Sequence, residues 1–245
     1  MPINWSWLDL AFPWIGVVAA VVLLALLFGT NLLRSEPTSS RWCDPVWLSW
    51  MASAAYLLHN GEEYGLDLLG HRHSFPDALC TNLKLPAYPG CPIPPAFYLA
   101  VNIPLFWIVA PLAALLSRRR PLMGLALYSV VFTNGLVHLI PVLVLGRGYN
   151  PGLLTAVVVF LPLSAWVSYA CFGKDRLSYK AMALLIIWGL VLHVVLAGSV
   201  IMFVNALISS TTLVWVQIVD AGLLLLILWL GEEWRGGVLL RPALT

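Results

Sequence analysis

Charged residues are scarce in this chain. Only 10% of its 245 residues are Asp, Glu, Lys or Arg, whereas ordinary soluble domains carry roughly 25%. Hydrophobic residues make up 61% of the sequence, and the mean hydropathy is +0.90. This composition excludes a soluble globular protein and predicts an integral membrane protein. The formal net charge of +2 gives no sign of nucleic-acid binding, so we expect no nucleic-acid partner.

Two kinds of functional lysine are also missing. The sequence has no glycine-rich phosphate loop that ends in lysine, which argues against ATP-driven work. Lys84, Lys174 and Lys180 lie in predicted loops or at a span boundary, so no lysine inside the last helix is available to hold retinal. The chain shows no internal repeat, which weakens an inverted-repeat transporter as an explanation.

Apolar runs long enough to cross a bilayer fill nearly the whole chain. A transmembrane helix needs about 20 mostly apolar residues. We therefore predict an all-α, polytopic membrane helical bundle with seven transmembrane helices, forming a single integral membrane domain over residues 1–245. The predicted spans are Ala11–Leu33, Val46–Leu66, Phe97–Leu116, Leu122–Leu145, Gly152–Phe172, Met182–Val204 and Thr211–Leu230.

Lysine and arginine are unevenly divided between the two predicted sides of the membrane. Because the positive-inside rule places the richer side in the cytoplasm, we expect the amino terminus outside and the carboxyl terminus in the cytoplasm. The richer side holds Arg34, Arg41, Arg118, Arg119, Arg120, Lys174, Arg176, Lys180, Arg235 and Arg241. The other side holds Arg72, Lys84 and Arg147.

Residues 68–95 form the one long connection, and they are rich in proline. This extracytoplasmic loop would cover the outer mouth of a polar site, so it is either a lid or a plain surface loop. Cys80 and Cys91 lie in it, on the side of the membrane where disulfides persist, and whether they pair is left open. Cys43 and Cys171 are expected to be free thiols near the cytoplasmic face.

One stretch of the second predicted span sets ionisable side chains inside an apolar run. Glu62 and Glu63 follow His59 by three and four residues, so a helix would project all three from one side. In the fourth predicted span, His138 follows Asn134 by four residues and falls at a similar depth, in the outer half of the membrane. Ionisable groups at membrane depth are costly and usually mark a functional site.

Histidine together with carboxylate suits a divalent metal ion, with zinc or iron the best candidates. The predicted metal ligands or acid–base catalysts are His59, Glu62, Glu63 and His138. His193 is a further predicted ligand, and Asn134 and Asp220 are predicted to orient the ligands from behind. We therefore predict a metal-dependent membrane enzyme, whose partner is a membrane lipid or another apolar small molecule.

Other functions stay open at this point. Paired glutamates with different pKa values could serve a metal-free isomerase, hydratase or cyclase of an isoprenoid-like lipid. A proton- or metal-coupled carrier also uses buried histidine and carboxylate groups. A purely structural role, in which these groups hydrogen-bond the helices together, is the remaining alternative.

Three motifs resemble those of the HXXEE family of bacterial integral membrane proteins. His59-Asn60-Gly61-Glu62-Glu63 carries the motif that names the family, His138 stands where that family has a further histidine, and Tyr149-Asn150-Pro151-Gly152 resembles its Tyr-x-Pro-Gly motif. The last stretch, taken by itself, favours a structural turn over a binding element. The resemblance covers residues 59–152 and implies a shared polar site in a protein of the bacterial cytoplasmic (inner) membrane, with no known reaction.

Overall fold

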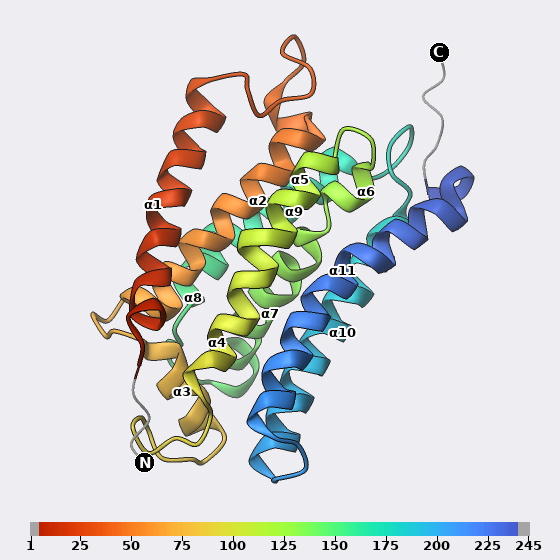
Figure 1. The fold of residues 1–245 in the computed structure, drawn as a ribbon. Coiled ribbons are helices and arrows are strands. Elements are labelled where there is room, and N and C mark those ends of the chain that lie inside the picture. Colours follow the sequence, from red (N-terminus) through yellow and green to blue (C-terminus); the bar gives the residue numbers. More distant parts are fainter. Residues whose placement is uncertain (1–4, 240–245) are drawn as a thin grey trace.

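The computed structural model describes residues 5–239, which are helical and contain no β-strand. Six of their helical segments are long and apolar enough to cross a membrane, so the chain has the character of a multi-pass membrane protein. Figure 1 shows them side by side in one elongated bundle. These segments are α1 (Trp7–Gly29), α4 (Pro95–Asn102) with η3 (Ile103–Val109) and α5 (Ala110–Leu116), α6 (Pro121–Gly124) with α7 (Leu127–Leu145), α8 (Leu153–Thr155) with η4 (Ala156–Phe160) and α9 (Leu161–Cys171), α10 (Tyr179–Val204), and α11 (Ser210–Leu239).

The predicted span Val46–Leu66 is not one of these six, so the prediction of seven transmembrane helices was wrong by this measure. The segment does fold as α2 (Pro45–Asn60) and the π-helical turn η2 (Gly61–Gly65), but its polar residues lower its mean hydropathy. Thirteen of the sixteen residues of α2 and all five of η2 are buried. Helices α1, α5 and α7 pack against α2 and surround it. Other helices therefore surround this segment. Because it contacts protein rather than lipid, it can carry polar residues.

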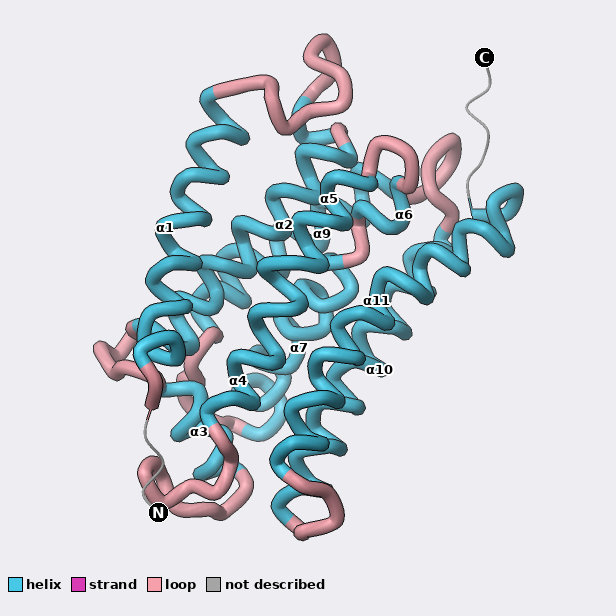
Figure 2. The backbone as a smooth tube through the Cα atoms, viewed as in Figure 1, coloured by secondary structure: helices cyan, strands magenta, loops and turns pink. Residues whose placement is uncertain are grey.

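The start of α2 is fixed by Asp44 and Pro45. The Asp44 carboxylate accepts hydrogen bonds from the backbone N–H groups of Val46 (2.9 Å) and Trp47 (3.3 Å), which otherwise have no partner at a helix start. Pro45 occupies the first helical position, where its missing N–H costs nothing. From this end α2 runs antiparallel to α1 and carries His59 to the far half of the bundle (Figures 1 and 2).

The two ends of the bundle differ in charge. One end carries the α1–α2, α5–α6 and α9–α10 connections together with the last turns of α11, and the opposite end carries residues 66–94, residues 146–152 and the α10–α11 turn (Figure 1). The larger predicted set of arginine and lysine lies at the first end, in its connections, at the start of α10 and in the last turns of α11, except that Arg241 lies outside the described residues. Arg72, Lys84 and Arg147 lie at the second end, so the fold keeps the two predicted sets apart.

The long connection 68–95 contains a short helix, α3 (Ser74–Asn82), and a disulfide between Cys80 and Cys91. The pairing that the sequence left open is therefore present. Cys43 and Cys171 are free, as predicted. Phe75 and Leu79 of α3 line an internal cavity, so this segment covers one end of it.

Candidate metal centre

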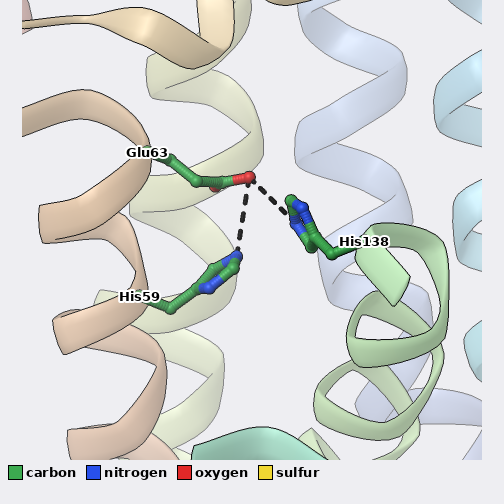
Figure 3. A group of neighbouring side chains, drawn as sticks. All are labelled: His59, Glu63 and His138. Atoms are coloured by element: carbon green, nitrogen blue, oxygen red, sulfur yellow. Dashed lines mark ion pairs between the residues drawn. The ribbon is translucent and has the colours of Figure 1, made fainter. Parts of the chain in front are cut away.

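Three of the predicted site residues meet at one point. Glu63 Oε1 lies 3.5 Å from His59 Nε2 and 3.3 Å from His138 Nε2, and Figure 3 shows the carboxylate between the two rings. One potential ligand atom of each residue lies within 4.8 Å of the other two. All three side chains are buried. Residues from α2, η2 and α7, far apart in the sequence, thus form a compact two-histidine, one-carboxylate group, which we call the triad.

The π-helical turn η2 sends the two adjacent glutamates to different neighbours. Its hydrogen bonds join residues five apart, as in the 2.9 Å bond from the Leu66 N–H to the Gly61 carbonyl, and this widens the helix. Glu63 points between the two histidines, whereas Glu62 contacts the segment 149–155. Glu62 therefore lies beside the triad rather than in it.

The Glu62 carboxylate accepts four hydrogen bonds. Oε1 accepts from the Tyr149 hydroxyl (2.8 Å) and the Leu154 N–H (3.0 Å), and Oε2 accepts from the Thr155 N–H (2.7 Å) and hydroxyl (2.6 Å). Burial raises the pKa of the Tyr149 hydroxyl, and the bond to Glu62 acts in the same direction, so this group stays a donor. Glu62 thereby fastens the segment 149–155 against η2.

Both triad histidines are oriented through their Nδ1 atoms. His138 Nδ1 lies 2.6 Å from Asn150 Oδ1, which can only accept, so His138 donates this bond. The Thr155 hydroxyl donates its single hydrogen to Glu62, so it accepts from His59 Nδ1 at 2.7 Å. In its neutral form, each ring therefore directs its Nε2 lone pair towards Glu63. Among the residues that the structure describes, the buried His59 Nε2 has no hydrogen-bond partner.

Gly152 allows the backbone to approach both rings. Its φ is +94°, and a Cβ atom at this position would lie 2.7 Å from His59 Cε1 and 2.6 Å from His138 Cε1. The stretch Tyr149–Gly152 thus supplies a donor to Glu62, a partner to His138 and a close backbone contact to both imidazoles. Its sequence favoured a plain structural turn, but the structure shows that the turn helps to build the site.

The remaining predicted residues face a cavity beside the triad. The cavity has a volume of about 130 Å³ and mostly apolar walls, and Glu63 and His138 lie on its surface together with Asn134, His193 and Asp220. His193 Nδ1 donates to the Gly189 carbonyl (2.8 Å), and Asn134 donates to the Tyr56 hydroxyl. Within the described residues, Asn134, His193 and Asp220 make no hydrogen bond to the triad, and none belongs to it.

Thr155 and Asn150 hold the two imidazoles, yet neither was singled out from the sequence. Thr155 lies inside a predicted span, where a lone threonine gives no functional signal. Asn150 occupies the variable position of the Tyr-x-Pro-Gly motif, so only its neighbours draw attention to it. Only the three-dimensional contacts reveal both residues.

Two of the ligand-atom separations in the triad fit a metal site. Zinc binds nitrogen and oxygen ligands at about 2.0–2.2 Å, so two ligands at a tetrahedral angle lie about 3.4 Å apart. The 3.3 and 3.5 Å separations match this value and exceed the roughly 2.7–2.9 Å of a charge-assisted N–H···O bond. Two histidines and one carboxylate leave coordination positions open, as in catalytic zinc and non-haem iron sites.

Comparison with known proteins identifies the region that carries the site. Residues 50–167 match a family described as "Protein of unknown function with HXXEE motif", which confirms the family resemblance seen in the sequence. The matched region includes the triad and the whole of the segment 149–155. Neither the curated proteins nor the solved structures give a significant match to the chain.

Proposed function

We propose that this chain, whose residues 50–167 match the HXXEE family, is a metal-dependent membrane enzyme that acts on a lipidic or otherwise apolar substrate. One observation carries the proposal: two imidazoles with fixed Nδ1 atoms aim Nε2 at a single Glu63 oxygen, beside an apolar cavity. Zinc or iron is the ion that this ligand set suits best. The cavity would hold the apolar substrate next to the open coordination positions.

The hydrogen-bond pattern favours a metal over a metal-free acid–base pair. In the metal-free alternative, Glu62 and Glu63 would divide the roles of acid and base. Glu62, however, already accepts four hydrogen bonds and lies away from the cavity lining. When both imidazoles are neutral, their Nε2 lone pairs face the Glu63 carboxylate and repel it, and a cation between them would convert this repulsion into attraction.

Each part of the chain has a defined task in this proposal. His59, Glu63 and His138 would hold the ion, while Thr155 and Asn150 keep the imidazoles in the tautomer that metal binding requires. A bound ion would supply Lewis acidity towards a substrate oxygen or a water molecule. The apolar cavity walls would keep bulk water out, and the segment 68–95 would act as a lid through α3.

Metal content tests the proposal directly. Protein purified without chelators is expected to contain about one zinc or iron ion per chain, and His138→Ala is expected to lower this to background because it removes a ligand. His71→Ala is the matched control, since His71 is an exposed histidine paired with Asp67. Elemental analysis measures all three proteins. A background metal content in the unmodified protein, or an unchanged content in His138→Ala, would contradict the proposal.

We also propose that the arginine-rich end of the bundle faces the cytoplasm of a bacterial inner membrane. A membrane-impermeant thiol reagent applied to intact cells should then label Ala87→Cys, in the exposed part of the segment 68–95. The exposed Cys43 at the arginine-rich end should react only after the cells are permeabilised. Gel-shift detection reports both sites, and labelling of Cys43 in intact cells would reverse the orientation.

A further inference from the structure

Helices α10 and α11 line the cavity with side chains that carry hydrogen-bond acceptors. His193 uses its Nδ1 hydrogen on the Gly189 carbonyl, so its Nε2 atom remains an acceptor. Gln217 donates through Nε2 to the Ser199 hydroxyl (2.8 Å), and no described residue donates to its Oε1 atom. Asp220, three residues after Gln217 and therefore on the same face of α11, adds a carboxylate.

Of these groups, Asp220 has the strongest need for a hydrogen-bond donor. It is only 7% exposed, and among the described residues it has neither a hydrogen-bond donor nor a cation as partner. It also borders a groove on the outer surface of α10 and α11, where Trp215 and Val219 are exposed. A carboxylate in such apolar surroundings is costly without a donor. Within the described part of the chain no donor meets this need, so a ligand in the cavity would be a suitable partner.

We propose that the cavity binds an apolar molecule whose polar head is a hydrogen-bond donor, either a hydroxyl or an ammonium group, and that this head donates to Asp220. The inference rests on the proposed function, because it names the substrate class of the same cavity. The acceptors on α10 and α11 explain why the head must be a donor: an ether or ester oxygen would leave Asp220 unpaired. The apolar remainder contacts the hydrophobic walls, among them Phe97, Leu105 and Phe106.

The position of Asp220 also indicates how such a molecule arrives. Asp220 lies at the boundary between the cavity and the outer groove of α10 and α11, which membrane lipid would cover. A lipid-soluble molecule can therefore place its head at Asp220 while its chain remains in apolar surroundings. Glu63 and His138 line the same cavity, so a bound molecule would lie beside the triad.

Binding of matched probes that share a dodecyl chain to the full-length protein in lipid nanodiscs tests this inference. Radiolabelled 1-dodecanol is the direct probe, and dodecylamine and dodecyl methyl ether are the competitors. We expect the ether to bind at least about tenfold more weakly than the better of the two donor probes, which is the usual cost of losing a hydrogen bond to a charged group. Asp220→Leu should remove this discrimination, while Glu233→Gln, an exposed carboxylate on the same helix, should preserve it.

Two further variants separate the possible outcomes. Asp220→Asn keeps an acceptor but loses the charge, so it should retain dodecanol binding and weaken dodecylamine binding if the natural head is cationic. His138→Ala removes a triad ligand but leaves Asp220 in place, so it should keep the discrimination between alcohol and ether. If the unmodified protein contains no metal but still discriminates alcohol from ether, the proposed function is refuted and this inference stands. Equal binding of all three probes, or full discrimination by Asp220→Leu, would overturn the inference.

Discussion

Glu63→Gln is expected to abolish metal binding, whereas Glu62→Gln, one residue earlier, is expected only to weaken it. The first substitution removes the charged ligand that both imidazoles face. The second leaves the triad intact but disturbs the contacts that hold the segment 149–155, and through Thr155 it also disturbs His59. Loss of hydrogen-bond partners behind metal ligands typically costs about 10–100-fold in affinity.

Competition with a chromophoric chelator of known affinity measures this contrast. Glu36→Gln is the matched control, because Glu36 is an exposed loop glutamate near the opposite end of the bundle and should leave the affinity unchanged. Equal losses in the two neighbouring variants would show that the glutamates share one role. A larger loss of affinity in Glu62→Gln would show that the ion binds Glu62 rather than Glu63, against our proposal.

Gly152→Ala is expected to destabilise the protein and displace both imidazoles. The new methyl group would lie within 2.7 Å of each ring, and overpacking of this kind typically costs about 1–3 kcal/mol. The positive φ adds about 1 kcal/mol, because left-handed backbone is unfavourable for residues with a Cβ. We therefore expect a loss of roughly 2–4 kcal/mol in stability, accompanied by loss of metal.

Gly146→Ala separates the two contributions. Gly146 also has a positive φ, of +60°, but a Cβ atom there would have nothing within 4 Å. It should therefore show only the backbone cost of about 1 kcal/mol and keep its metal. Thermal unfolding in detergent and elemental analysis compare the two variants. If both variants unfold at the same temperature and hold equal metal, the close contact of Gly152 with the imidazoles does not contribute to stability or to metal binding.

Composition and residue spacing predicted the fold class and the centre of the site. Apolar runs of the length of a bilayer require helices, since an unpaired backbone is too costly in lipid. The meeting of His59 and His138 was predictable because both fall at a similar depth on neighbouring segments. The predicted number of membrane helices was wrong because Val46–Leu66 was counted as an apolar run, whereas its polar residues lower its hydropathy and other helices bury it.

The division of labour between the two glutamates could not be predicted. A regular helix places Glu62 and Glu63 on one side of His59, and only the π-helical turn, whose hydrogen bonds depend on the surrounding packing, sends them to different partners. The same holds for the segment 149–155. Its contacts with Glu62 and His59 join residues more than 80 positions apart, and spacing within a motif does not reveal such pairs.

The π-helical turn at Gly61–Gly65 makes the length of this stretch as critical as its composition. One residue turns an α-helix by about 100°, so losing a residue here would swing Glu63 away from the two histidines even if every letter of the motif survived. Evolution can therefore exchange side chains around the centre more freely than it can insert or delete a single position. Relatives that lack the proposed metal site should therefore differ from this chain by an insertion or deletion in this stretch rather than by substitutions alone.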